Sequence, residues 1–237
     1  KFLEHFLEIA LAMTAMGGGE DGLWDENDEF YYDQLLLPDG RRIPMRIQSI
    51  VGLIPLFAVE VLEPETLEKL PQFAEHLDRT FEKRPELYDL VSHWKEPGRG
   101  ERRLFSLLRG HRMKCLFKRM LDEDGFFSPH GIRSLSKFHQ DHPYAIEIEG
   151  TRYTIDYEPA ESHTTLFGGN SNWRGPIWFP INFLLLEAMQ RFHHYYGDDF
   201  KIECPVGAKE TVTIWDASLM VAERLTSLFK KDAKGHR

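Results

Sequence analysis

Side chains able to recognise a ligand gather in residues 168–180, which read GGNSNWRGPIWFP. Pro176 fits the first turn of a helix, so the residues before it would stand at a helix N-terminus, where backbone N–H groups lack partners. Such an end favours hydroxyl-rich or anionic ligands, and indole faces stack on the apolar faces of a sugar ring. The candidate binding residues here are Asn172, Trp173, Arg174 and Trp178.

The same stretch also has a purely structural interpretation. Trp178 and Phe179 could belong to the core, and Arg174 could pair with a carboxylate such as Glu161. The glycines could simply form a turn. Composition alone does not separate the two interpretations.

A second aromatic and acidic stretch, GLWDENDEFYYD, covers residues 22–33. It predicts a sugar subsite in which Trp24 forms a wall, and Asp25 or Glu26 binds hydroxyls or transfers protons. The alternative is a solvated acidic turn that leads into a hairpin. A calcium-binding loop is excluded, because Phe30 stands where that loop needs a glycine.

A third stretch, SPHGIRSLS, covers residues 128–136. As loop residues, His130 and Arg133 would be able to face a pocket. Alternatively, Arg133 holds a turn together by donating to a backbone carbonyl. His139 and His142 are a weak metal pair, since no third ligand stands in register with them.

The elements that position these stretches follow from apolar periodicity. The longest amphipathic pattern covers residues 176–196, and Gly197 would end it. Alternating residues and turn signals predict hairpins at 30–46 and 144–158. Further helices are predicted at residues 1–16, 49–62, 64–83 with a break at Pro71, 86–94, 109–121 and 213–230.

Composition narrows the class of protein. Of the 237 residues, 42% are hydrophobic, and the formal net charge is −9. This charge and the lack of a basic stripe argue against nucleic acid and anionic membranes as partners. Cys115 and Cys204 are the chain's two cysteines, too few for a disulfide framework, and they do not suggest a zinc site. We therefore expect a cytoplasmic protein.

Together the three stretches resemble glycoside hydrolase family 63, which contains processing α-glucosidases and mannosylglycerate hydrolase, and most closely its bacterial members. The matching residues are 22–33, 128–136 and 168–200, with support from 46–65 and 156–162. The resemblance implies a mainly α fold, a segment of an (α/α)6 toroid with β-hairpins in its long loops. Residues 1–237 would form roughly the C-terminal half of one catalytic domain, with flanking residues missing at both ends.

The resemblance also implies a chemistry, the inverting hydrolysis of α-glycosidic bonds by two carboxylates roughly 6.5–9.5 Å apart. In the family the acid is an Asp upstream and the base is a Glu beyond Arg237, so no catalytic residue is expected in this chain. No cofactor or metal is implied. The expected partners are an oligosaccharide or small glycoside and the rest of the catalytic domain. The implied pocket-wall residues are Trp24, Asp25, Arg133, Asn172, Trp173, Arg174 and Trp178, with Glu161 as a weaker candidate.

Two rival functions stay open. The first is a sugar epimerase or isomerase on the same toroid, with His130 and His163 as its acid and base groups. The second is a non-catalytic carbohydrate-binding protein, which would keep the aromatic pocket without a carboxylate pair.

Overall fold

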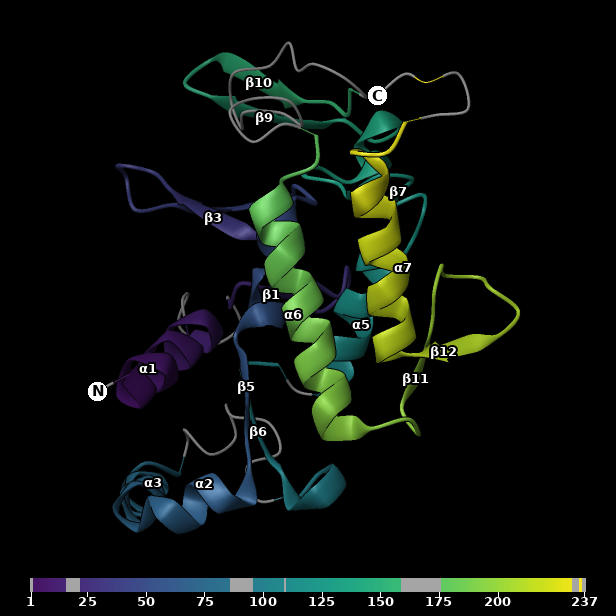
Figure 1. The fold of residues 1–237 in the computed structure, drawn as a ribbon. Helices are drawn as coiled ribbons and strands as arrows, with labels where there is room; N and C mark the ends of the chain where they lie inside the picture. Colours follow the sequence, from purple (N-terminus) through teal and green to yellow (C-terminus); the bar gives the residue numbers. More distant parts are fainter. Residues whose placement is uncertain are drawn as a thin grey trace.

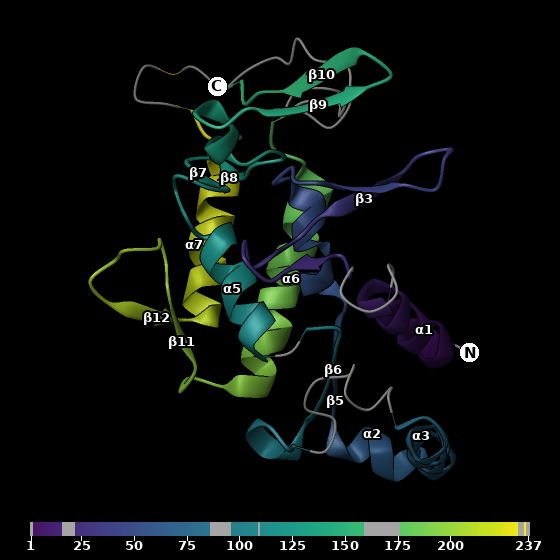
Figure 2. The ribbon, with the colours of Figure 1, turned by 180° about the vertical axis from the view of Figure 1, so that it is seen from behind.

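The computed structural model describes residues 2–15, 22–85, 96–108, 110–158, 176–231 and 235. Figures 1 and 2 show helices α6 and α7 side by side, with α5 packed against them. Helices α1, α2 and α3 lie to one side of this centre (Figure 1). The bounds are α1 Phe2–Ala15, α2 Pro64–Lys69, α3 Pro71–Lys83, α5 Gly110–Met120, α6 Phe179–Tyr196 and α7 Ile214–Ser227.

Short strands are interspersed among these helices. Within the described residues, twelve strands form six separate two-stranded sheets, each of them antiparallel. The expectation of a mainly α toroid segment is therefore wrong. The pairs are β1 Trp24–Asp25 with β2 Phe30–Tyr31, β3 Asp33–Leu36 with β4 Arg42–Met45, β5 Val59–Leu62 with β6 Arg103–Ser106, β7 Phe127–Ser128 with β8 Gly131–Ile132, β9 Tyr144–Ile148 with β10 Thr151–Ile155, and β11 Lys201–Glu203 with β12 Thr211–Thr213.

Two of the six sheets were predicted from the sequence, and the other four were missed for different reasons. The β3–β4 and β9–β10 pairs confirm the two predicted hairpins. Two-residue strands, such as those of β1–β2 and β7–β8, are too short to show alternation. In the β5–β6 sheet Val59 pairs with Ser106, and no local pattern reveals a partner so distant in sequence.

The predicted helix over residues 49–62 is also wrong. Ser49 is the expected N-cap, and its hydroxyl accepts a hydrogen bond from the Val51 N–H. The turn that follows is the 3-10 helix η1, Ile50–Phe57, which contains Pro55. The chain then becomes strand β5, whose Val59 and Val61 have the branched side chains that strands favour.

The other predicted helices are confirmed wherever the structure describes them. The break at Pro71 separates α2 from α3. Helix α6 begins three residues after Pro176, with Trp178 as its N-cap, and it ends at Gly197 with φ +74°. The predicted piece at 86–94 lies outside the described residues.

The main core lies where α5, α6, α7 and η1 meet. The rings of Phe117 in α5 and Phe192 in α6 pack edge to face, with centroids 5.7 Å apart. The apolar stripe of α6 that packs into this core consists of Ile181, Leu185, Ala188, Met189 and Phe192. Leu184 of the same helix is exposed.

The β7–β8 hairpin is joined to the first turn of α6 by a buried amide. Asn182 accepts a hydrogen bond from the Ile132 N–H at 2.7 Å and donates to the Ile132 carbonyl at 3.0 Å. Gly131 has φ +113°, and a Cβ there would lie 3.0 Å from the Asn182 Oδ1. Glycine is therefore required at this position. The backbone of Arg133, which follows Ile132, is thereby held near the start of α6.

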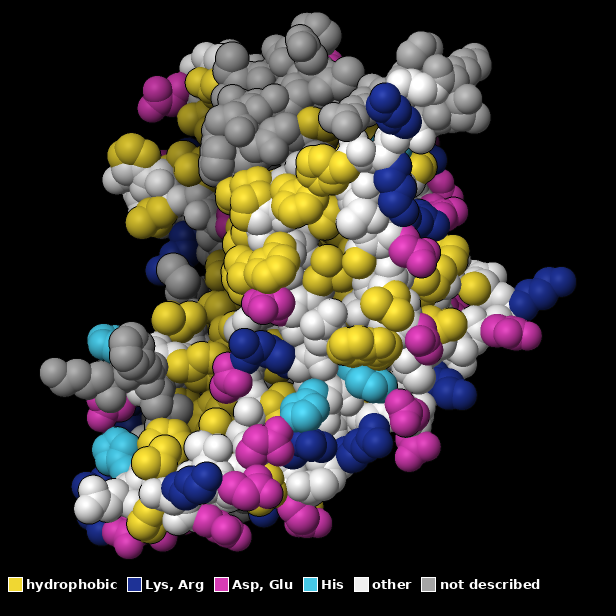
Figure 3. All heavy atoms as spheres, viewed as in Figure 1, with side chains coloured by type: hydrophobic (Ala, Val, Ile, Leu, Met, Phe, Trp, Pro, Cys, Tyr) yellow, Lys and Arg dark blue, Asp and Glu magenta, His cyan; other side chains and the backbone are white. Residues whose placement is uncertain are grey.

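Hydrophobic side chains gather on the outward surface of α6 and α7 (Figure 3). The exposed large hydrophobic residues of these two helices include Phe183, Leu184, Trp215 and Leu219. Apolar patches of this kind are uncommon on monomeric proteins unless they serve an interaction. Within the described part of the chain, every helix is too short or too polar to cross a membrane.

Candidate functional site

A pocket of about 350 Å³, here called the β1–β4 pocket, opens between the turn that follows β1 and the β3–β4 hairpin. Its wall combines an indole, a phenol, amides, carboxylates and guanidinium groups. This mixture can donate hydrogen bonds to hydroxyls and accept hydrogen bonds from them. The lining residues are Gly22, Leu23, Trp24, Asp25, Glu26, Asn27, Tyr32, Gln34, Arg42, Pro44 and Arg46.

Asp25 lines this pocket with both of its carboxylate oxygens already engaged. Oδ1 accepts hydrogen bonds from the backbone N–H groups of Asn27 and Asp28, each at 2.9 Å. Oδ2 accepts a hydrogen bond from Arg46 Nη2 at 2.7 Å. These contacts fix the turn and the Arg46 side chain, so Asp25 orders the wall rather than transferring protons.

Trp24 is almost fully buried at the back of the same wall. Its ring packs edge to face on Tyr31, with centroids 4.9 Å apart, and the Arg112 guanidinium lies 4.8 Å from its centroid. Both contacts cover the ring, which leaves little surface for a sugar to stack on. The buried indole Nε1 has no hydrogen-bond partner among the described residues.

Sequence reasoning missed the β-hairpin side of the pocket. Arg42, Pro44 and Arg46 line it from β4 and the residue after it, and Gln34 lines it from the paired position on β3. Residues two apart on a strand point to the same face. The period-2 pattern of the predicted hairpin was therefore a signal that could have found them.

Tyr32 completes the pocket floor. Its hydroxyl donates to Asp28 Oδ2 at 3.0 Å. Burial raises the pKa of Tyr32, and the Asp28 carboxylate raises it further. The phenol therefore stays protonated and serves as a donor across the physiological range.

Arg133 lies outside this pocket. Its Nη1 donates to the carbonyls of Glu123 and Gly125, at 3.0 and 3.1 Å, and its Nε donates to the Tyr157 hydroxyl at 3.3 Å. The guanidinium is buried and its donors hold a loop. This corresponds to the alternative interpretation of the SPHGIRSLS stretch.

Trp178 lies at the N-cap of α6 and packs against the main core, half-buried. It is not a lining residue of the β1–β4 pocket. The structure thus brings Trp24 and Asp25 together, and it holds Arg133 and Trp178 elsewhere. Asn172, Trp173, Arg174 and Glu161 lie outside the described residues.

Of the two histidines considered for the epimerase alternative, the structure describes His130, which does not line the pocket. His130 is exposed, and its Nδ1 lies 3.2 Å from the Ser227 hydroxyl oxygen. His163 lies outside the described residues.

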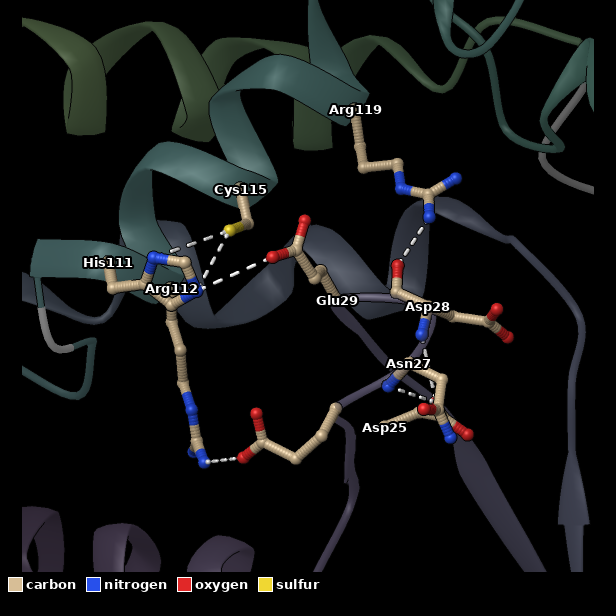
Figure 4. A network of polar contacts seen from close by, with 9 residues as sticks. Asp25, Asn27, Asp28, Glu29, His111, Arg112, Cys115 and Arg119 are labelled. Atoms are coloured by element: carbon tan, nitrogen blue, oxygen red, sulfur yellow. Dashed lines mark hydrogen bonds and ion pairs between the residues drawn. The ribbon is translucent and has the colours of Figure 1, made fainter.

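The acidic turn between β1 and β2 is anchored to α5 on two sides (Figure 4). Arg112 Nη2 donates to Glu26 Oε1 at 3.1 Å. Arg119 donates to the Asp28 backbone carbonyl. The pocket wall is therefore positioned by α5 as well as by its own turn.

Comparison with known proteins adds a family and one relative. Residues 105–204 match the model of the glycosyl hydrolase family 63 C-terminal domain. That range contains Arg133 and Trp178, whereas Trp24 and Asp25 precede it. The uncharacterized protein YMR196W of Saccharomyces cerevisiae is 42% identical over 249 residues, an alignment that covers 100% of this chain and 23% of the relative.

The chain thus spans 23% of the length of its yeast relative. A particular likeness to bacterial members stays a prediction. The match to the glycosyl hydrolase family 63 C-terminal domain is confined to residues 105–204.

Proposed function

We propose that the polypeptide carrying this chain hydrolyses α-glycosidic bonds, in α-glucosides or mannosylglycerate-type substrates. The observation that carries this proposal is the family 63 match over residues 105–204. The reaction is inverting, with an acid on the leaving oxygen and a base that activates water. As the resemblance implies, both carboxylates come from outside this chain.

The chain's contribution is a wall that binds sugar hydroxyls at the β1–β4 pocket. Arg46 is the central donor, because Asp25 holds one of its nitrogens at 2.7 Å and thereby orients the guanidinium. Fixed donors lose little side-chain entropy on binding, so they favour one orientation of the ring.

Further features of this function are proposed from the sequence. The substrate-binding roles of Asn172, Trp173 and Arg174 rest on the sequence motif. Cytoplasmic location, independence of nucleic acid and membrane, and pairing with the rest of the catalytic domain rest on composition and resemblance. No contact of a described residue favours the epimerase alternative.

The test uses the complete natural polypeptide with a panel of α-glucosides and mannosylglycerate, followed by proton NMR. We expect free sugar whose anomeric proton has the inverted configuration when first released. Formation of an epimer without cleavage would replace this proposal with the isomerase alternative. Saturable binding of a glycoside without turnover would instead indicate a carbohydrate-binding protein.

A further inference from the structure

Three side chains of metal-ligating type meet between α5 and the β1–β2 turn (Figure 4). None of the three lines the β1–β4 pocket. They are Glu29, His111 and Cys115, and one ligand atom from each lies within 4.8 Å of the others. His111 Nε2 is 3.5 Å from Cys115 Sγ and 3.4 Å from Glu29 Oε1. The imidazole thus stands between the thiol and the carboxylate.

The backbone brings these side chains together from two segments. His111 and Cys115 are four residues apart on α5, a spacing that places both on one face of the helix. Glu29 comes from the β1–β2 turn with φ +50°, a conformation uncommon for a residue with a side chain. The next residue, Phe30, is fully buried and therefore anchors the backbone directly after Glu29.

Neighbouring contacts hold the carboxylate against α5. Arg112 pairs with Glu26 before Glu29, and Arg119 binds the Asp28 carbonyl immediately before it. Asp25 closes the same turn through two backbone N–H groups. Orientation of ligands by surrounding hydrogen bonds is a general property of metal sites in proteins.

The distances fit tetrahedral coordination of one ion. With Zn–N of about 2.05 Å, Zn–S of about 2.3 Å and Zn–O of about 2.0 Å, tetrahedral angles give N···S of about 3.6 Å and N···O of about 3.3 Å. The observed separations from His111 Nε2 are 3.5 Å to sulfur and 3.4 Å to oxygen. Little rearrangement around the imidazole is therefore needed.

Ligand chemistry and charge select the ion. Thiolate and imidazole ligands suit Zn²⁺, whereas Ca²⁺ and Mg²⁺ prefer sets of oxygen ligands. One thiolate and one carboxylate neutralise a divalent cation, and the thiol proton passes to solvent on binding. Cys115 is buried, while the His111 and Glu29 side chains are 71% and 44% exposed, so the ion can enter from solvent.

We propose that Glu29, His111 and Cys115 bind one Zn²⁺ ion through Oε1, Nε2 and Sγ, with a fourth position open to water. The ion ties the β1–β2 turn to α5, and this turn directly follows Trp24 and Asp25 of β1, which line the pocket. The proposal does not depend on glycoside hydrolysis. No zinc site was expected from the sequence, because two cysteines are too few for one built mainly from thiolates. The site proposed here uses a single cysteine.

The test titrates the metal-free natural polypeptide with Co²⁺ as a spectroscopic probe and then competes it with Zn²⁺. We expect one Co²⁺ per chain with a thiolate charge-transfer band, lost when Zn²⁺ displaces it. Cys115→Ser, His111→Gln and Glu29→Gln should each weaken Zn²⁺ binding by more than about 100-fold, a larger loss than surrounding residues usually cause. Arg112→Ala, which removes a positioning contact, should weaken it by roughly 10–100-fold.

Two matched controls complete the design. Cys204→Ser removes the other cysteine of the chain, and Glu149→Gln changes a glutamate with φ +51° in the β9–β10 hairpin. Both should bind Zn²⁺ like the natural polypeptide, and circular dichroism should show every variant folded. A missing thiolate band would overturn the proposal. So would loss of binding in Cys115→Ser with full affinity in the other two ligand variants, because that pattern describes a lone thiol.

Discussion

Oδ2 of Asp25 lies 2.7 Å from Nη2 of Arg46, and this pair joins the last residue of β1 to the residue after β4. The two residues are 21 positions apart in sequence and form opposite sides of one pocket. The Asp25 side chain is 14% exposed and the Arg46 side chain is 52% exposed. The carboxylate is thus largely covered by protein, and the guanidinium faces the space where a ligand would enter.

Asp25→Ala should destabilise the fold by about 1–3 kcal/mol, because it leaves two turn N–H groups and one guanidinium without their acceptor. The matched control is Asp39→Ala, which removes an exposed carboxylate paired with Arg41 at 2.7 Å. Exposed pairs contribute about 0–1 kcal/mol. Calorimetric melting of both variants measures the difference, and equal losses would show that Asp25 does not order the turn.

Asn182→Ala should cost at least about 2 kcal/mol, since it strands the buried N–H and C=O of Ile132. The control Gln190→Ala truncates an amide on the same helix that makes no comparable bridge to another described residue. This variant should stay within about 0.5 kcal/mol. Urea unfolding measures both. Similar values for the two variants would remove the bridge between α6 and the β7–β8 hairpin from this account.

The buried His139 should make the folded state less stable at acidic pH. It is buried, its Nε2 accepts from the Gln48 N–H at 2.9 Å, and its Nδ1 lies 2.9 Å from the His142 carbonyl, to which it donates. Burial lowers the pKa of His139 below its ordinary value of 6.5. The unfolded chain therefore binds the extra proton first, and stability falls as pH drops below 6.5 towards the lowered folded value.

Melting temperatures between pH 7 and pH 5 check this prediction. His139→Gln can keep the acceptor for Gln48 and cannot take up a proton, so its melting temperature should fall less over this range than that of the natural polypeptide. His142→Gln is the control, because His142 is exposed. Parallel curves for the natural polypeptide and His139→Gln would assign the pH dependence to other groups.

Trp178→Ala should act on stability, because Trp178 packs against the core at the start of α6. Truncating a largely buried tryptophan costs about 3–5 kcal/mol, an upper range for this half-buried ring. Trp173→Ala, by the sequence prediction, should weaken glycoside binding with little change in melting temperature. If the two variants exchange these effects, Trp178 and not Trp173 is the ring that contacts the sugar.

Local patterns in the sequence were sufficient for part of this fold. A proline or glycine marks the boundary at Pro71 and at Gly197, and the apolar stripe of α6 needed only its own periodicity. The pairing of Val59 with Ser106 joins segments 47 residues apart, and the pattern of β5 alone suited a helix continued from η1. Pairing of distant segments is a tertiary property that periodicity does not encode.

The sequence likewise indicated some lining residues of the candidate site and missed others. Residue type identified Trp24 and Asp25, because an indole beside a carboxylate is a recognisable motif. Arg46 was not predicted, because it reaches Asp25 only when strand β4 pairs with β3. Arg133 has the residue type expected of a ligand-binding group, yet its donors are directed at backbone carbonyls. Side-chain direction depends on tertiary contacts, so composition cannot settle it.

The most direct test of the central claim, that the β1–β4 pocket binds the glycoside, compares Arg46→Gln with Arg41→Gln in the complete polypeptide. Arg41 belongs to the same hairpin, pairs with Asp39 and does not line the pocket. Losing a hydrogen bond from a charged donor corresponds to a fall in kcat/KM of roughly 10–100-fold. We predict this fall for Arg46→Gln, an unchanged value for Arg41→Gln, and equal melting temperatures within a few degrees. Unchanged kcat/KM in Arg46→Gln would contradict it and move the sugar site away from this pocket.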